Sequence, residues 1–191
     1  LRVVTPNVGG GFGTKAFLYA EQALVVWAAR KVERPVKWTS ERMEAFLSDA
    51  QGRDLVNVGE LALDADGHFL GLRVSTFGAI GAYLSNFIPF VLTIGPTGML
   101  TGTYRMPCAY LNVKGTMTNT VPVDAYRGAG RPEAIYMIER LTDLAALEMG
   151  IDRIELRRRN FVTPEEMPYA TPLHHEFDSG EFEALTDACM E

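Results

Sequence analysis

Few residues of this 191-residue sequence can bind a transition metal or form a disulfide, because it holds only two cysteines and three histidines. Cys108 and Cys189 lie far apart and form no metal-binding pattern. His174 and His175 have no Cys or carboxylate at ligand spacing. We therefore assign no metal site to the side chains of this sequence, and we expect a reducing, cytoplasmic environment.

Long apolar runs and an excess of basic residues are also lacking. No unbroken apolar run is long enough to cross a bilayer, so we expect no membrane-spanning segment. Lys and Arg total 18 against 24 Asp and Glu, which gives a net charge of −6. Because nucleic acids are bound through a surplus of Lys and Arg, this balance argues against a nucleic-acid partner.

The length and composition are those of an ordinary globular protein, with 47% hydrophobic and 22% charged residues. A chain of this length forms one domain with a core, or part of a larger domain. It begins within an apolar run, residues 1–6, and stops within a helical pattern, residues 181–191. We expect residues 1–191 to be a single fragment of a longer polypeptide, truncated at both ends.

The spacing of apolar residues predicts an α+β fold, with mixed β-sheets and packed helices. The most specific signal is Asp66-Gly67 between two alternating runs, which predicts a β-hairpin over residues 55–77. A bulge is expected at Gly59. Helices are predicted at 16–32, 41–47, from Pro132 to Gly150, and at 153–160 with Asp152 as its cap. Strands are predicted at 1–6, 34–41 and 110–120, and an extended arm at 163–180.

Two glycine-rich turns are the candidate sites: Gly9 to Lys15, and residues 125–134 with the sequence AYRGAGRPEA. Each is expected to join the end of a strand to the start of a helix. Free N–H groups at a helix start attract anions and electron-rich atoms. Glycine lets a ligand reach those groups without a Cβ in the way.

Common nucleotide motifs do not fit the first turn. A phosphate-binding loop needs Gly directly before the Lys, where Thr14 stands, and the third Gly of a dinucleotide fingerprint also falls on Thr14. Phe12 among the glycines suggests a ligand with a flat substrate beside it. Arg127 and Arg131 flank the second turn and suit phosphate or pterin recognition. The structural alternative is that both turns are tight connections and both arginines are solvated surface residues.

The motifs of this chain resemble those of the molybdenum hydroxylases, which include xanthine dehydrogenase, aldehyde oxidase and aerobic carbon monoxide dehydrogenase. The stretches VGGGFGTK, RPVKW, AYRGAGRPEA, LAALEMGID and ELRRRNF occur in this order and at about this spacing in that family. The resemblance covers essentially the whole chain. YRMPCAYLNV and EEMPYATPLHHEFDSG are most similar to the large subunit of the carbon monoxide dehydrogenase branch.

The resemblance implies that this is the first part of a molybdenum-cofactor-binding domain, which holds molybdopterin cytosine dinucleotide. It implies hydroxylation with water as the oxygen source. Electrons would leave through [2Fe-2S] clusters on an iron–sulfur small subunit and FAD on a medium subunit, in a dimer of heterotrimers. The implied cofactor-binding residues are Gly10, Gly11, Phe12, Gly13, Ala125, Tyr126 and Arg127.

The chain also departs from the family pattern. In copper-containing carbon monoxide dehydrogenases a Cys follows AYR and holds the copper, whereas here Gly128 follows it, which argues against copper and against carbon monoxide as substrate. Purine-oxidising members place Glu after the turn Lys, where this chain has Ala16, which disfavours a purine. A small aldehyde or N-heterocycle remains open. The general base of the family lies in a segment outside this sequence, so we expect no catalytic residue here.

These considerations give a mechanistic hypothesis for the second turn. Gly128, Ala129 and Gly130 would be small because the pterin and the substrate channel lie against them, and Phe12 and Gly128 would form pocket walls. Arg127 would hold the pterin edge by charge-assisted hydrogen bonds. The rival hypothesis is a non-catalytic scaffold or subunit-contact domain whose glycine turns are structural.

Overall fold

The predicted hairpin is present in the computed structural model, which describes residues 2–191. Strands β1 (Leu55–Leu63) and β2 (Phe69–Gly81) pair antiparallel around the Asp66-Gly67 turn. The predicted bulge at Gly59 is wrong, because the register shifts between Ala62 and Leu63 instead. Gly59 has another role: a Cβ there would lie 2.8 Å from Leu141 Cδ1, so its lack of a side chain lets a helix pack against β1.

Strand β3 (Ala109–Met117) completes a mixed sheet, as predicted for residues 110–120. It pairs parallel with β2, which gives the order β1-β2-β3. The connection between β2 and β3 carries the short helices α3 (Ile88–Leu92) and α4 (Ile94–Thr97). Because β3 runs parallel to β2, its C-terminal end delivers the chain to the same edge of the sheet as the end of β2.

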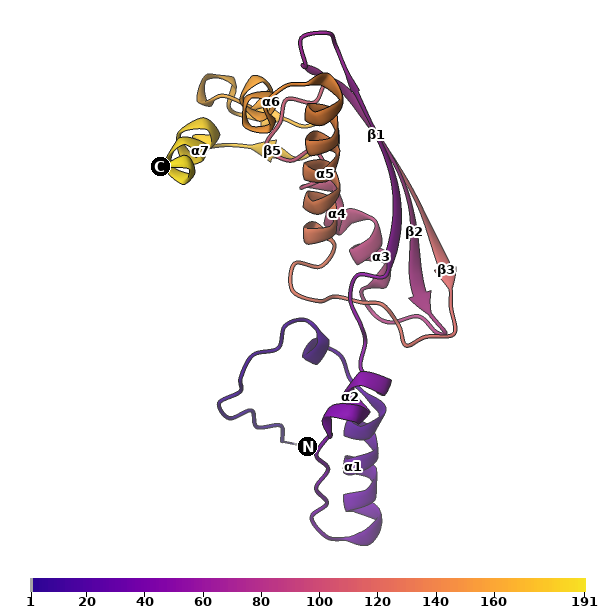
Figure 1. Ribbon diagram of the computed structural model, residues 1–191. Helices are drawn as coiled ribbons and strands as arrows, with labels where there is room; N and C mark the ends of the chain where they lie inside the picture. Colours follow the sequence, from indigo (N-terminus) through magenta and orange to yellow (C-terminus); the bar gives the residue numbers. More distant parts are fainter. Residues whose placement is uncertain (1) are drawn as a thin grey trace.

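Helix α5 (Arg131–Met149) packs along the sheet, as Figure 1 shows. Pro132 lies in its first turn and Gly150 ends it with a φ of +65°, as predicted. The core between sheet and helices contains Phe69, Leu72, Val74, Leu100, Tyr104, Met106, Ala134, Met137, Ile138, Ala145, Ala146, Leu156 and Phe161. This core is what holds the start of α5, and so the turn before it, in a fixed place.

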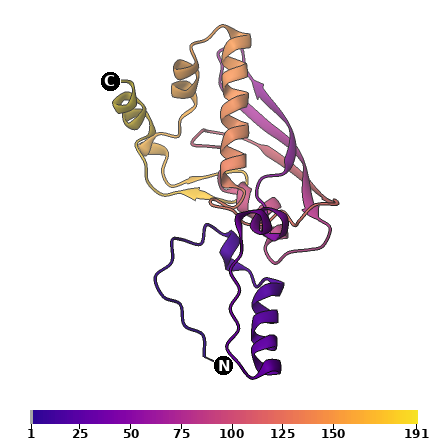
Figure 2. The same cartoon turned by 60° about the horizontal axis from the view of Figure 1, so that its bottom comes forward.

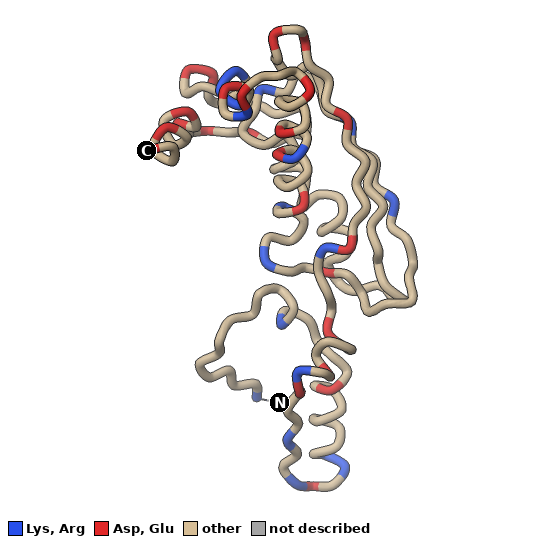
Figure 3. Tube along the Cα trace, in the orientation of Figure 1, with Lys and Arg blue, Asp and Glu red and all other residues tan. Residues whose placement is uncertain are grey.

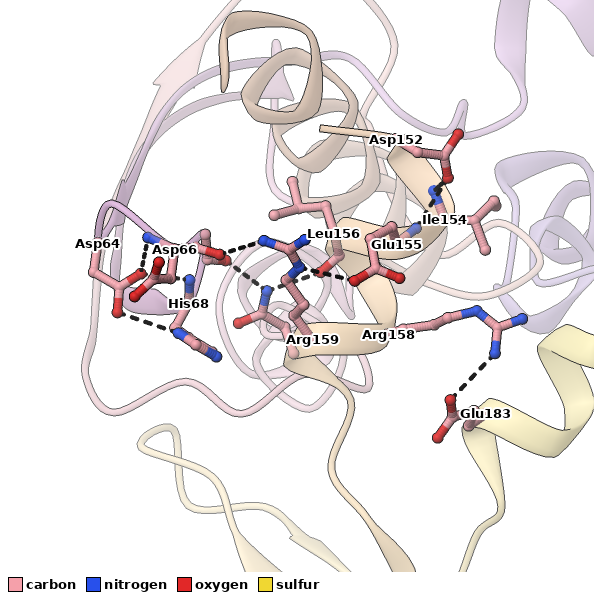
Figure 4. A network of polar contacts seen from close by, with 12 residues as sticks. Asp64, Asp66, His68, Asp152, Ile154, Glu155, Leu156, Arg158, Arg159 and Glu183 are labelled. Carbon is pink, nitrogen blue, oxygen red and sulfur yellow. Dashed lines mark hydrogen bonds and ion pairs between the residues drawn. The ribbon is translucent and has the colours of Figure 1, made fainter. Parts of the chain in front are cut away.

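Helix α6 (Arg153–Asn160) is capped by Asp152, whose Oδ1 accepts bonds from the amides of Ile154 and Glu155 at 2.8 and 3.0 Å. The C-terminal end of α6 is hydrogen-bonded to the hairpin turn between β1 and β2 (Figure 4). Arg159 donates to the Asp66 carbonyl at 2.7 Å, and the buried Asn160 donates to the Gly67 carbonyl at 2.8 Å.

The predicted arm at 163–180 contains more structure than expected. It holds a 3₁₀ turn, η2 (Pro164–Glu166), and a two-stranded sheet of β4 (Tyr169–Ala170) and β5 (Glu176–Phe177), followed by α7 (Phe182–Met190). Tyr169 anchors the arm because its hydroxyl accepts a hydrogen bond from the amide of Met106 at 2.9 Å.

The N-terminal region differs most from expectation. It holds η1 (Thr14–Ala16), α1 (Ala20–Val32) and α2 (Arg42–Ser48), and the two views in Figures 1 and 2 show it projecting from the sheet and α5. The predicted strands at 1–6 and 34–41 are wrong: residues 2–6 and 34–41 form none, since no strand in the described chain lies beside them to complete a ladder.

Helix α1 is present but starts four residues later than predicted, at Ala20, and buries none of its residues. Leu24 and Trp27, on its apolar face, are 57% and 60% exposed. Within residues 2–191, no helix combines the length and the apolar character needed to cross a membrane. The architecture as a whole, a mixed sheet with packed helices, confirms the predicted α+β class.

Candidate functional site

The two glycine-rich turns lie against each other. The amide of Arg127 donates a hydrogen bond to the carbonyl of Phe12 at 2.9 Å. A Cβ added to Gly13 would collide with the carbonyl oxygen of Ala125 and lie 3.2 Å from Tyr126 Cα. We call residues 9–15 and 124–131 together the turn junction. The structure therefore brings together every residue predicted to bind the cofactor.

The second turn joins its helix as expected, but the first does not. Residues 128–130 lead directly into α5. The first turn instead opens η1, a single 3₁₀ turn, and an extended segment separates it from α1. The dipole of α1 therefore does not act at the first turn, and the backbone amides of that turn would have to attract an anion without it.

Both turns hold backbone in the left-handed region. Phe12 has a φ of +52° and Ala129 a φ of +47°. Phe12 precedes Gly13, and Ala129 lies between Gly128 and Gly130, and all three glycines have positive φ. A non-glycine residue in this region costs about 1 kcal/mol or more, so the surrounding contacts must fix it. Such strained backbone clusters at binding sites in many proteins. The conformation is consistent with a preformed site at the turn junction.

Several glycines are required by the chain itself, which revises the hypothesis about residues 128–130. A Cβ at Gly128 would lie 2.5 Å from the ring carbons of Pro132, and one at Gly130 would collide with the carbonyl oxygen of Val91. Both also have positive φ, +98° and +90°. A ligand is therefore not needed to explain their lack of side chains.

Gly9 and Gly11 are different, because a Cβ at either would meet nothing within 4 Å, and neither has a positive φ. Their backbone faces open space in the described chain. The segment is also free of charged side chains from Val3 to Thr14, which Figure 3 shows as an unbroken tan tube. These are the positions where a ligand can approach the main chain.

Several hydrogen-bond donors at the turn junction have no acceptor within residues 2–191. No amide from Gly10 to Thr14 donates a hydrogen bond to any described residue. The guanidinium of Arg127 is exposed and makes no hydrogen bond or ion pair within residues 2–191. A molybdopterin dinucleotide offers pterin acceptors, and its pyrophosphate offers anionic oxygens. Free amides beside open backbone and a free arginine fit the chemistry of that group.

Two residues that sequence reasoning missed hold the turns in place. The Tyr19 hydroxyl donates to the Thr14 carbonyl at 2.6 Å and accepts from the Ala50 amide at 3.2 Å. Burial raises the pKa of Tyr19 above its usual value, so the hydroxyl keeps its proton. Asp124 is buried, and its carboxylate accepts from the amides of Ala125 at 2.6 Å and Phe87 at 3.2 Å. No local sequence pattern marks either residue, because one partner of each, Ala50 for Tyr19 and Phe87 for Asp124, is distant in the chain.

Two cavities flank the junction. One of about 680 Å³ lies beside the first turn and α2, and its lining includes Lys15, Arg42, Asp49, Arg53 and Tyr126. The other, of about 580 Å³, lies between β1 and α5, and its lining includes Arg53, Asn57, Glu133, Tyr136 and Arg140. Both are large enough to bind part of a cofactor-sized ligand. Neither is lined by Gly10, Gly11 or Phe12, which lie outside them on the open surface.

The thiols lie away from the junction. Cys108 directly precedes β3 and contacts the Leu70 carbonyl, whereas the second turn follows the other end of that strand. Nine residues of strand separate the two ends by about 30 Å. Cys189 lies in α7. Among residues 2–191, no group of three or more His, Cys, Asp or Glu side chains is arranged to bind a metal ion.

Comparison with known proteins agrees with this geometry. Residues 1–161 match the molybdopterin cofactor-binding domain family. The chain is 39% identical over 186 residues to the 6-hydroxypseudooxynicotine dehydrogenase complex subunit gamma of Paenarthrobacter nicotinovorans, covering 95% of this chain and 23% of that protein. It is 39% identical over 184 residues to the carbon monoxide dehydrogenase large chain of Hydrogenophaga pseudoflava, with the same two shares.

Solved structures show the same fold. CO dehydrogenase from Oligotropha carboxidovorans superposes with a TM-score of 0.89 at 34% identity, over 98% of this chain and 24% of that one. Quinoline 2-oxidoreductase from Pseudomonas putida 86 gives a TM-score of 0.85 at 32% identity, over 97% and 25%. This chain therefore spans about a quarter of the length of these relatives.

Proposed function

Because this chain belongs to the molybdopterin cofactor-binding domain family, we propose that its turn junction forms one side of a molybdopterin cytosine dinucleotide site in a molybdenum hydroxylase. When bound, this group would supply the two-electron redox chemistry that hydroxylates a substrate with oxygen from water. The observation that supports the proposal most directly is the contact between Phe12 and Arg127, which joins the turn with the free amides to the turn that carries the Arg127 guanidinium. We propose that residues 1–191 are the first part of that cofactor-binding domain.

The residues of the junction have separable roles. The free amides of Gly10, Gly11 and Gly13 would donate hydrogen bonds to the cofactor, since none of them has a partner in the described chain. Arg127 would add a charge-assisted hydrogen bond at the pterin edge. The Phe12 ring, which is 49% exposed, would wall the substrate pocket and exclude water from it.

The substrate we favour is a small aldehyde or N-heterocycle. Gly128 carries no thiol, and both cysteines lie elsewhere in the fold, so the described chain offers no sulfur ligand for copper at the junction. The relatives include a nicotine 6-hydroxylase large subunit and a quinoline 2-oxidoreductase, whose names refer to N-heterocycles. The general base would come from a part of the polypeptide outside residues 1–191.

Partners are proposed on two grounds. Relatives are named as a complex subunit and as large chains or subunits of their enzymes. Apolar side chains of α1 and α2 are also exposed, with Trp27 at 60% and Phe46 at 64%. We propose that other parts of the large subunit cover this face, and that the subunit assembles with an iron–sulfur small subunit and an FAD medium subunit as a dimer of heterotrimers.

The proposed function is tested by composition of the native complex. Full-length protein, purified with its partners, should contain molybdenum and a pterin cytosine dinucleotide at about one per large subunit, without copper at comparable occupancy. Elemental analysis and mass spectrometry of the extracted cofactor measure both. A preparation that contains neither, although it is folded and fully assembled, would favour the alternative of a scaffold whose glycine turns are structural.

A further inference from the structure

Arg53 lies outside both turns, in the connection before β1, and contacts the second turn at three points. Its guanidinium donates a hydrogen bond to the carbonyl of Arg127. It stacks over the Tyr126 ring, 4.8 Å from the ring centroid. Its Nε lies 3.7 Å from a carboxylate oxygen of Glu133, in the first turn of α5. One side chain thereby links the beginning, the middle and the end of the connection into α5.

We propose that Arg53 is a positioning residue, which fixes the second turn in the shape that presents Arg127 to the pterin group. The inference rests on the proposed function, because it names a further residue of the same site. Arg53 itself does not face the open amides of the first turn; its contacts are with Tyr126, Arg127 and Glu133. It would act through the turn and not by touching the reacting atoms.

The backbone around Arg53 is shaped for this contact. Arg53 has a φ of +66°, a left-handed conformation that only surrounding contacts can maintain in a residue with a long side chain. At the preceding position, Gly52, a Cβ would lie 2.7 Å from Tyr126 Cβ. The glycine lets the two segments approach, and the left-handed residue turns the guanidinium toward Arg127. The contact between Arg53 and the second turn thus explains both the glycine at position 52 and the left-handed backbone at Arg53.

The turn that Arg53 holds needs such support. Gly128, Ala129 and Gly130 have three consecutive positive φ angles, and the Arg127 carbonyl immediately precedes them. Among the described residues, Arg53 is the only ion-pair partner of Glu133, whose Oε2 is buried and accepts no hydrogen bond. A lysine could pair with Glu133, but it could not stack on Tyr126 and donate to Arg127 with one planar group.

The test uses the full-length complex with Arg53→Met, Arg53→Lys and a matched control, Arg73→Met. Arg73 also forms an ion pair, with Glu60, but on the exposed surface of the sheet. Two quantities are measured well below the melting temperature: the rate at which bound pterin is lost after dilution, by pterin fluorescence, and hydrogen exchange in residues 124–131. Pterin loss reports on the site, whereas a merely structural role would lower the melting temperature without changing that rate.

Arg53→Met should lose pterin about tenfold faster than wild type, because Arg127 would no longer be held in place to donate its charge-assisted hydrogen bond to the pterin, and exchange in 124–131 should be faster. Arg53→Lys should recover only part of this, and Arg73→Met should match wild type. If wild type holds pterin and Arg53→Met retains it equally long, the role of Arg53 is overturned while the proposed function stands. If wild type holds no pterin, the proposed function is overturned, and the role of Arg53 toward it is overturned as well.

Discussion

The amide of Arg127 and the carbonyl of Phe12 are joined by a 2.9 Å hydrogen bond between two turns that lie far apart in the sequence. The bond uses the backbone of both residues and leaves their side chains free. The Arg127 guanidinium and the Phe12 ring are both exposed beside amides that lack partners. The two turns therefore act as one unit, and a change in either should affect the other.

Gly11→Ala should lower cofactor content without lowering stability. A Cβ at this position meets nothing in the chain, and the backbone does not need glycine. In the holoenzyme the methyl group would occupy the space through which the pterin group reaches the amides. We expect a lower molybdenum content at an unchanged melting temperature. A full molybdenum content would show that no ligand approaches Gly11.

Gly13→Ala, in contrast to Gly11→Ala, should lower the stability of the protein. Its Cβ would collide with the Ala125 carbonyl, and its φ is +93°, so the two turns could not keep their contact. We expect a loss of about 2 kcal/mol or more in the free energy of unfolding, together with loss of cofactor. Urea unfolding of the full-length protein measures the first. Equal stability of Gly13→Ala and Gly11→Ala would contradict the proposed packing of the turns.

Tyr19→Phe should loosen the first turn and leave helix α5 intact. The substitution removes the hydroxyl that links Thr14 to Ala50 but keeps the ring. Each lost hydrogen bond to a partly buried group costs about 1 kcal/mol. We expect faster hydrogen exchange in residues 9–16 and unchanged exchange in α5. Unchanged exchange in both segments would mean that the hydroxyl does not hold the turn.

Tyr104→Phe should destabilise the core between α5 and the sheet. The buried hydroxyl donates to Glu139 at 2.7 Å, and burial, followed by that carboxylate, raises the pKa of Tyr104 far above its usual value. Arg157 remains paired with Glu139 in the variant, so no charge is left alone. We expect a loss of about 1 kcal/mol in the free energy of unfolding, with normal cofactor content.

Asp152→Asn tests the pH dependence of the α6 cap. Hydrogen bonds from the Glu155 and Ile154 amides lower the pKa of Asp152 below its ordinary value of 3.8. A carboxylate with a lowered folded-state pKa stabilises the fold above its unfolded pKa and loses that contribution as the pH falls through the folded one. Asparagine keeps the cap but does not titrate.

The difference in melting temperature between wild type and Asp152→Asn should therefore be largest near neutral pH. It should shrink as the pH falls below about 4. Thermal unfolding of both proteins across that range gives the comparison. A difference that stays constant down to about pH 3 would show that the charge of Asp152 contributes nothing to the cap.

The elements that sequence predicted correctly are those with local signals. Asp66-Gly67 specifies its own hairpin, and Pro132, Gly150 and Asp152 mark helix ends through contacts within a few residues. The failures depend on partners elsewhere. Residues 34–41 have a strand-like pattern but no neighbouring strand in the described chain. Gly59 forms no bulge; its lack of a side chain makes room for Leu141 of α5.

In the candidate site, too, the features with local sequence signals could be predicted and those that depend on distant residues could not. The glycine turns were visible in the sequence, and the family resemblance assigned both to one cofactor site. The bond between Phe12 and Arg127 shows that the two turns meet, and cofactor binding there stays a prediction. Tyr19, Arg53 and Asp124 could not be found, because each acts through residues distant in the chain. The sequence also did not show why position 128 needs glycine, which is that the Pro132 ring leaves no room for a side chain there.

The most direct test of the account is a structure of the assembled full-length complex. We predict density for a pterin dinucleotide against the amides of residues 10–13, with the Arg127 guanidinium at hydrogen-bonding distance from it. Density at this place that belongs to another segment of protein, with the pterin group bound elsewhere or absent, would contradict the central claim.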